Sequence, residues 1–156
     1  MCGGVSYYHD GKMRKVYFPQ SDAQLPIKLK DVTKPDHLLP WGRREWEEGN
    51  LPATGWARLE SLKAGKWDQY RPISAKIKVD QFMEKDKDGE PHWFGLNAGQ
   101  FIQGAVVSWK GERRVYVVTI QPQGALAAIH DRWPRLVGPG AERSDLPGKI
   151  EQEIPG

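Results

Sequence analysis

The sequence contains a single cysteine, Cys2, among its 156 residues. One cysteine excludes an intramolecular disulfide, and one thiol needs at least three further ligands to make a zinc site. The histidines do not supply them, because their positions show no spacing typical of a metal motif; they are His9, His37, His92 and His130. We therefore expect a protein that uses no metal and no other cofactor.

The chain also lacks a long apolar run. No window approaches the roughly 18 apolar residues of a membrane-spanning helix, and the N-terminus has no apolar signal-peptide core. Hydrophobic residues make up 38% and charged residues 28% of the chain, which is typical of a soluble globular protein. The length suits one domain. We expect a cytoplasmic monomer with no membrane partner.

The excess of positive charge is small, with a formal net charge of +3 and a sequence pI of about 9.0. Its distribution is more informative, because arginines and tryptophans are interleaved along the chain. Arginine contacts phosphates and tryptophan offers a stacking face, the combination found in single-stranded nucleic-acid sites. The alternative is that the tryptophans form the core and the arginines cover the surface. The interleaved residues are Arg43, Arg44, Arg58, Arg71, Arg113, Arg114, Arg132 and Arg135 with Trp41, Trp46, Trp56, Trp67, Trp109 and Trp133.

Short apolar runs broken by glycine and proline favour a mostly β fold. Strands are expected at 5–8, 14–18, 27–32, 36–41, 75–79, 92–96, 101–109 and 113–120. The last two flank Lys110-Gly111-Glu112 and predict a hairpin. The run 75–79 alternates apolar and polar residues, as a half-buried strand does.

Two segments predict helices: 56–67, with Thr54 as its N-cap, and 123–129, which ends before Pro134. After residue 137 the chain turns to glycine, proline and charge. We therefore predict one α+β, predominantly β domain over 1–137, with an open or barrel-like mixed sheet and a few short helices. A C-terminal tail would follow over 138–156.

Cys2 becomes N-terminal if Met1 is removed, because methionine aminopeptidase accepts a small second residue. Its α-amine, with a pKa of roughly 8, and its thiol, with a pKa of about 8.5, would then both have nucleophilic fractions near neutrality. Together they can condense with an aldehyde, first as a Schiff base and then as a thiazolidine ring. The alternative is a small residue at a frayed chain end.

Three separated segments resemble the SOS response-associated peptidase (SRAP) family. Met1-Cys2-Gly3 matches the family's Met-Cys-Gly-Arg start, and Gln-Phe-Met-Glu-Lys at 81–85 is similar to its Gly-Phe-Tyr-Glu-Trp. Ile-His-Asp-Arg-Trp-Pro at 129–134 is close to the family's Ile-His-Asp-Arg-Met-Pro and is the most specific of the three. Weaker matches are Trp41-Gly42 and the stretch Trp-Ala-Arg-Leu-Glu-Ser at 56–61. The order and approximate spacing hold from residue 1 to about 137.

The resemblance implies roles for the matching catalytic positions. Cys2 would be the nucleophile that attacks the ring-opened aldehyde of an abasic site in single-stranded DNA. Glu84 would exchange protons at the Cys2 amine, and His130 would help to open the sugar. A carboxylate and an imidazole can exchange protons near neutral pH without a metal. The resemblance also implies self-removal of Met1 and a role in the DNA damage response.

The same resemblance extends to DNA binding. Arg58 would contact the DNA backbone, and Trp41 would stack or wedge beside the lesion. Arg43 and Arg132 complete the expected DNA-binding set. Arg132 has a structural alternative, as a buried partner of Asp131 or Glu84.

Two departures from the family lie beside Cys2. Trp56 stands where the family has an asparagine, and an indole has one N–H donor and no acceptor. Gly4 stands where the family has an arginine that contacts DNA. A divergent, phage-derived member is one explanation, and loss of crosslinking with retained DNA binding is another. Two other functions stay open: a cysteine peptidase that acts in trans with Cys2 as N-terminal nucleophile, and a non-catalytic module that binds single-stranded nucleic acid.

Overall fold

Two β-sheets make up most of the structure, a computed structural model that describes residues 2–29, 33–122 and 132–139. The expected helix at 123–129, His130 and most of the expected tail lie outside the described residues. The predominantly β fold with a few short helices is confirmed. Within the described ranges, no helix is both long and apolar enough to cross a membrane.

The smaller sheet has the strand order β2-β1-β7-β8, and all its pairs are antiparallel. Its strands are β1 (Gly4–His9), β2 (Lys12–Tyr17), β7 (Gln81–Lys85) and β8 (Pro91–Gly95). Glycine-containing turns join the strands of both of its hairpins, β1–β2 and β7–β8. Gly11 and Gly89 have positive φ angles of 75° and 82° in these turns, a conformation that glycine adopts without steric cost.

The larger sheet has the order β11-β10-β9-β6-β3-β4, with β12 paired to β9 and β5 paired in parallel to β10. Its strands are β3 (Gln24–Ile27), β4 (His37–Pro40), β5 (Trp56–Arg58), β6 (Ile73–Ile77), β9 (Phe101–Trp109), β10 (Glu112–Ile120), β11 (Trp133–Pro134) and β12 (Leu136–Val137). The parallel pairing of β5 with β10 makes this sheet mixed, and the predicted β9–β10 hairpin is confirmed.

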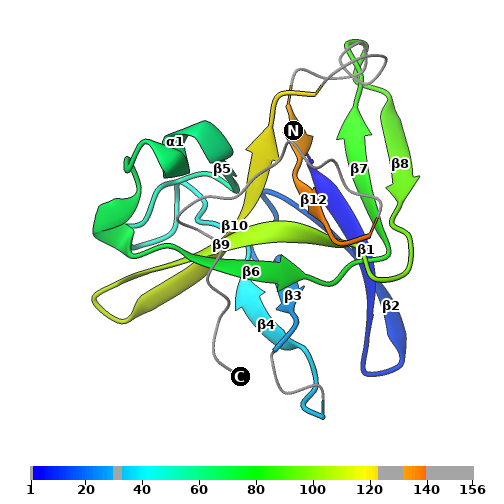
Figure 1. Cartoon of the computed structure of the whole chain (residues 1–156), viewed down its shortest axis with the longest axis horizontal. Helices are drawn as coiled ribbons and strands as arrows, with labels where there is room; N and C mark the ends of the chain where they lie inside the picture. The colour runs from blue at the N-terminus through cyan, green and yellow to red at the C-terminus, as the bar shows by residue number, and fades with distance from the viewer. Residues whose placement is uncertain (1, 30–32, 123–131, 140–156) are drawn as a thin grey trace.

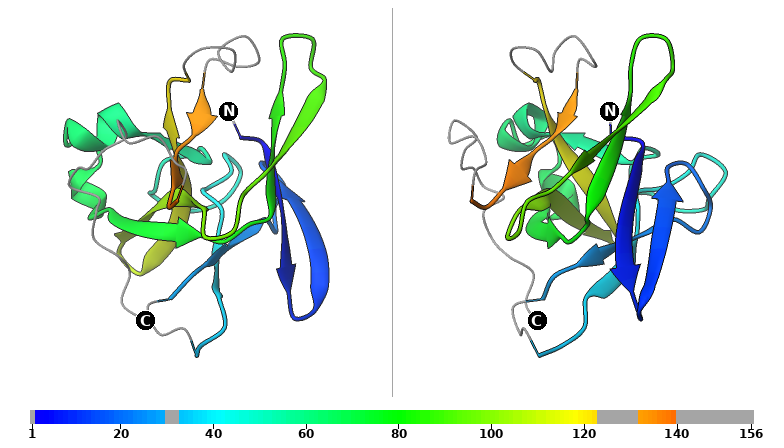
Figure 2. Two further views of the ribbon diagram at one scale, coloured as in Figure 1. Left: turned by 45° about the vertical axis from the view of Figure 1, so that its right-hand side comes forward. Right: turned by 90° about the vertical axis from the view of Figure 1, so that its right-hand side faces the viewer.

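The main core lies between the two sheets (Figures 1 and 2). Val5 and Phe82 come to it from the smaller sheet, and Ile77 and Val115 come from the larger one; each is at most 1% exposed. A second cluster covers the other side of β9 and β10 beneath α1 (Leu59–Lys63) and the 3-10 turn η1 (Asp68–Tyr70). β9 and β10 are therefore covered on both faces, which explains why neighbouring residues such as Val106 and Val107 in β9 and Val117 and Val118 in β10 are all apolar.

The helix predicted over 56–67 is wrong at its start. Residues 56–58 form β5, because they pair with Val117, Val118 and Thr119 of β10. Only 59–63 are helical, and Gly65, with φ of 81°, follows the end of α1. The strand predicted at 27–32 is displaced as well, since β3 ends at Ile27. Pairing partners distant in sequence decided both boundaries.

Candidate functional site around Cys2

The two residues before β1 are tied to both sheets. The Gly3 amide donates to the Met83 carbonyl at 3.0 Å, and the Gly3 carbonyl accepts from the Phe18 amide at 3.2 Å. The Trp56 indole N–H donates to the Cys2 carbonyl at 2.7 Å. Cys2 is therefore a fixed part of the fold, and the alternative of a frayed chain end is wrong.

The Cys2 thiol lies in the core with no exposed surface, 3.6 Å from the Gly4 carbonyl to which it donates. Burial raises the pKa of this thiol well above its usual range, and the nearby Glu84 carboxylate raises it further. Both effects disfavour the thiolate. In this state Cys2 is a protonated thiol that needs a base before it can act as a nucleophile.

Glu84 is the residue that the structure brings to Cys2. It is fully buried in β7, on the strand that pairs directly with β1. Phe82 and Glu84 project to the core face of the smaller sheet, because side chains two apart in a strand share a face. Of the predicted set Cys2, Glu84 and His130, the first two are within electrostatic reach of each other. His130 lies outside the described residues.

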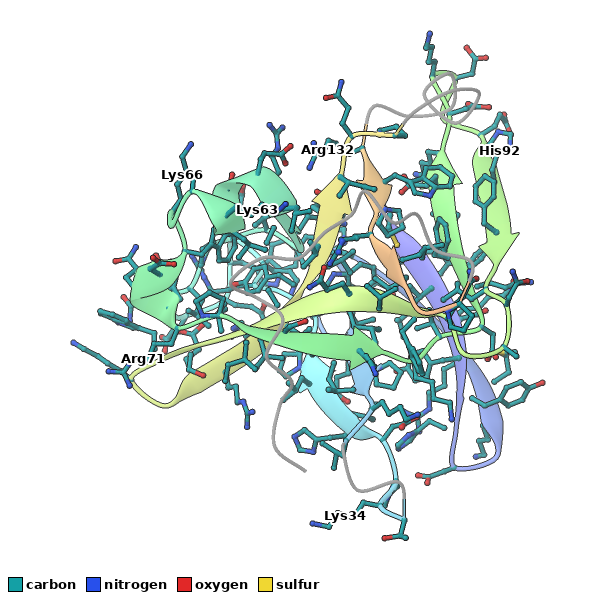
Figure 3. All side chains as sticks on the ribbon, viewed as in Figure 1. Lys34, Lys63, Lys66, Arg71, His92 and Arg132 are labelled. Carbon is teal, nitrogen blue, oxygen red and sulfur yellow. The ribbon has the colours of Figure 1, made fainter. Side chains whose placement is uncertain are left out.

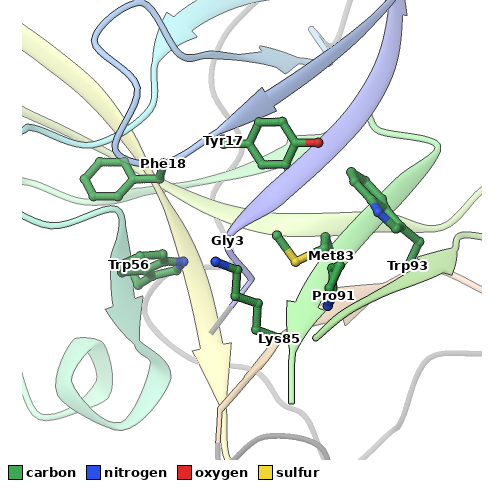
Figure 4. A pocket seen from close by; sticks show the side chains of 8 residues that line it. All are labelled: Gly3, Tyr17, Phe18, Trp56, Met83, Lys85, Pro91 and Trp93. Carbon is green, nitrogen blue, oxygen red and sulfur yellow. The ribbon is translucent and has the colours of Figure 1, made fainter. Parts of the chain in front are cut away.

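A pocket of about 590 Å³ opens on the opposite face of β7 and β8 (Figure 4). Met83 and Lys85 of β7 are cross-strand partners of Trp93 and Pro91 of β8, so all four side chains share this face. Gly3 also lines the pocket, so the pocket borders the residue that directly follows Cys2. The lining residues are Gly3, Tyr17, Phe18, Trp56, Met83, Lys85, Pro91 and Trp93. The pocket thus combines aromatic walls with one cation, next to the Cys2 main chain.

Trp56 and Gly4, the two positions that depart from the SRAP pattern, both contact residues of the pocket. Trp56 lines the pocket and supplies a donor to the Cys2 carbonyl, so the predicted neighbour contact is made through its indole N–H. At Gly4, a Cβ atom would lie 2.8 Å from Cδ1 of Tyr17. The Tyr17 ring therefore covers the position from which the family's arginine would project.

The prediction that Trp41 stacks on DNA is wrong. Trp41 has no exposed surface, and its indole donates to the Gly55 carbonyl at 3.0 Å. A Cβ atom on Gly42 would lie 2.1 Å from the Thr54 carbonyl oxygen, and Gly42 has a φ of 58°. Trp41 and Gly42 therefore connect the main core to the loop at 54–55, Trp41 by its hydrogen bond and Gly42 by its close approach to Thr54.

The arginines predicted to bind DNA divide into exposed and engaged groups. Arg58 is exposed at the end of β5, two residues after Trp56. Arg43 is half-buried and donates to the carbonyls of Leu51 and Glu47. Those hydrogen bonds hold its own loop together, which makes it a poor phosphate ligand and goes against the predicted DNA contact.

Arg132 is a buried structural residue, which was the alternative to a DNA contact. Its carboxylate partner is Glu60, whereas the sequence predicted Asp131 or Glu84. It is 7% exposed and donates to the Glu60 carboxylate at 2.7 Å and to the Thr119 carbonyl at 2.8 Å. Figure 3 shows it at the end of β10. The guanidinium joins α1 to β10, and the predicted DNA contact is wrong because so little of Arg132 is accessible.

Sequence reasoning missed Tyr17, Lys85 and Trp93 as site residues. The alternation within the stretch 81–85 could have found Lys85, since Phe82 and Glu84 facing the core require Met83 and Lys85 to face outward. Tyr17 reaches the pocket through its pairing with Gly4 in the β1–β2 hairpin.

In the part of the chain that the structure describes, no group of three or more histidine, cysteine, aspartate or glutamate residues is placed to hold a metal ion. A comparison with models of protein families gave no match, and neither did a search of curated proteins. The resemblance to the SRAP family therefore stays a prediction that rests on the residues quoted above.

Proposed function

We propose that the protein binds single-stranded DNA at the pocket beside Gly3 and crosslinks to abasic sites through Cys2 once Met1 has been removed. The observation that carries this proposal is the pairing of a buried thiol with a buried carboxylate behind that pocket. The pocket volume falls within the range of about 300–1,000 Å³ that is usual for small-ligand sites. It is large enough for a nucleotide-sized group.

The chemistry needs two bonds to the aldehyde carbon of the ring-opened sugar. The Cys2 α-amine adds to that carbon and water leaves, which gives an imine. The thiol sulfur then adds to the imine carbon, its proton passes to the nitrogen, and a thiazolidine ring results. No oxidant or reductant is consumed.

Glu84 supports this sequence as the base for a thiol whose pKa is raised. A carboxylate in a low-dielectric site can accept the thiol proton while sulfur attacks, so that a free thiolate never accumulates. The raised pKa also keeps Cys2 unreactive before an aldehyde arrives. His130 stays the predicted second proton carrier.

The test uses protein whose N-terminus is verified as Cys2 by mass spectrometry. Incubation with abasic single-stranded DNA should give an adduct that survives heat and detergent, whereas the same strand with an intact base should give none. Cys2→Ala should abolish the adduct, and Glu84→Gln should slow its formation by about 100-fold or more, the usual range for loss of acid–base catalysis. Absence of any adduct from the verified protein would contradict crosslinking.

The complete burial of Cys2 favours one second candidate, a binding module that does not crosslink. It predicts single-strand binding without an adduct, unchanged in Cys2→Ala. A fluorescence-anisotropy titration of both proteins with abasic and intact strands, run beside the adduct assay, separates the two functions.

A further inference from the structure

Lys85 is the last residue of β7 and is exposed. Among the described residues that line the 590 Å³ pocket, it carries the only side-chain amine. Figure 4 shows its side chain extended from β7 toward Gly3, with the terminal nitrogen between Trp56 and Met83. Lys85 and Gly3, the residue after Cys2, therefore line the same pocket.

The pocket wall places this amine on the solvent side of the sheet. Glu84, the preceding residue, projects to the core and is fully buried. Lys85 pairs with Pro91 across β7 and β8, and both face the pocket. A ligand entering the pocket therefore reaches the Lys85 amine without any rearrangement, whereas the Cys2 thiol lies behind the Gly3 main chain.

Two lysines place positive charge at the pocket, which favours an anionic ligand. Lys15 holds its ammonium 5.0 Å from the centroid of the Trp93 ring, which lines the pocket. Lys15 and Lys85 together give this region two positive charges, which favour the phosphates that flank a sugar in a nucleic acid. The aromatic walls suit the sugar and the adjacent base.

We propose that Lys85 forms a Schiff base with the aldehyde of an abasic site bound in this pocket. The Nζ lone pair adds to the aldehyde carbon, a proton moves to the oxygen, and water leaves to give the imine; hydrolysis reverses the step. The proposal rests on the proposed abasic-DNA ligand but requires neither the Cys2 thiol nor removal of Met1. The SRAP pattern has tryptophan at this position, so the amine is a feature of this chain.

The experiment traps the imine with sodium cyanoborohydride, which reduces it to a stable secondary amine. The full-length protein and abasic single-stranded DNA are incubated with and without the reductant, and the modified residue is located by peptide mapping. We expect a reductant-dependent adduct on Lys85, in wild-type protein and in Cys2→Ala alike. Lys85→Arg should lose it, because arginine keeps the charge but has no primary amine.

Lys66→Arg is the matched control, since Lys66 projects from the end of the molecule opposite β7 and β8 (Figure 3). It should keep the Lys85 adduct. An adduct confined to the N-terminal residue, one spread over several lysines, an undiminished adduct in Lys85→Arg, or no trapped adduct at all would each overturn the proposal. A reductant-independent adduct at Cys2 reports only on the thiazolidine function, so the failure of one leaves the other measurable.

Discussion

Trp56 and Gly4 are the two positions beside Cys2 at which the chain departs from the SRAP pattern. At both positions an aromatic ring packs next to the departing residue, Phe18 at Trp56 and Tyr17 at Gly4. The Trp56 ring packs edge-on against Phe18, with centroids 5.1 Å apart, while its N–H donates to the Cys2 carbonyl. Tyr17 covers Gly4. At the residue scale, aromatic side chains stand where the SRAP pattern has an amide and a guanidinium.

Trp56→Phe tests the hydrogen bond to Cys2 directly. Phenylalanine keeps most of the ring contact but removes the donor, so the Cys2 carbonyl loses its indole partner. We expect the free energy of unfolding to fall by about 1 kcal/mol, the usual net value of one hydrogen bond, plus a smaller packing loss. A urea titration measures it, and the rate of adduct formation should fall with it. An unchanged unfolding midpoint would show that the bond adds no stability.

At the scale of elements, α1 is too short to be stable alone and depends on contacts with β10. Its five residues lack a side-chain N-cap, and Leu59 and Leu62 bury its apolar side. The ion pair of Glu60 with Arg132 adds a further link to β10, because Arg132 also donates to the Thr119 carbonyl. The Arg132 guanidinium holds the pKa of the Glu60 carboxyl below its usual value, mainly through its hydrogen bond.

Glu60→Gln should therefore have a pH-dependent cost. Because the folded-state pKa is lowered, the ion pair stabilises the protein above the unfolded-state pKa of about 4.3, and this stabilisation is lost as the pH falls through the lowered value. The Glu60 side chain is 59% exposed, so the gain is below about 1 kcal/mol. Unfolding free energies of both proteins at pH 7 and pH 3 should differ more at pH 7. An equal difference at the two pH values would refute the ion pair's contribution.

At the scale of the whole molecule, much of the interleaved arginine and tryptophan pattern is interior. Trp41 and Trp133 are buried, and Arg44, Arg132 and Arg135 are at most 7% exposed. These arginines satisfy carbonyl and carboxylate groups within the fold. The core alternative to the nucleic-acid interpretation thus accounts for a large part of the pattern. Exposed cations such as Arg58 and Lys85 are the remaining candidates for contacts with the proposed DNA ligand.

Arg58 provides the test at this scale. Binding of intact single-stranded DNA should weaken as salt rises, with a slope of about 0.7 in the logarithm of the binding constant for each phosphate contacted. Arg58→Gln should reduce that slope by about one such increment, because it removes one exposed cation near the pocket. Lys66→Gln should leave the slope unchanged. Equal slopes for Arg58→Gln and the wild type would exclude Arg58 from the binding surface.

The mostly β fold and the β9–β10 hairpin follow from local patterns of the amino-acid sequence. Alternation of apolar and polar residues and the turn chemistry of Asp10-Gly11 and Lys110-Gly111 are local properties, so a short window contains all the information needed. Cys2 could be singled out as the only cysteine, at the second position of the chain, whereas Glu84 could be singled out only by resemblance.

The surroundings of Cys2 depend on contacts between segments distant in the chain. Trp56 reaches the Cys2 carbonyl because β5 joins β10 in parallel. We predicted from the sequence that Trp41 and Arg132 contact DNA, but residues distant in the chain bury both side chains. Long-range pairing sets which face of each strand is covered. The sequence therefore identifies Cys2 as a potentially reactive residue. Its burial, and the position of the Lys85 amine in the pocket next to Gly3, depend on how the two sheets assemble.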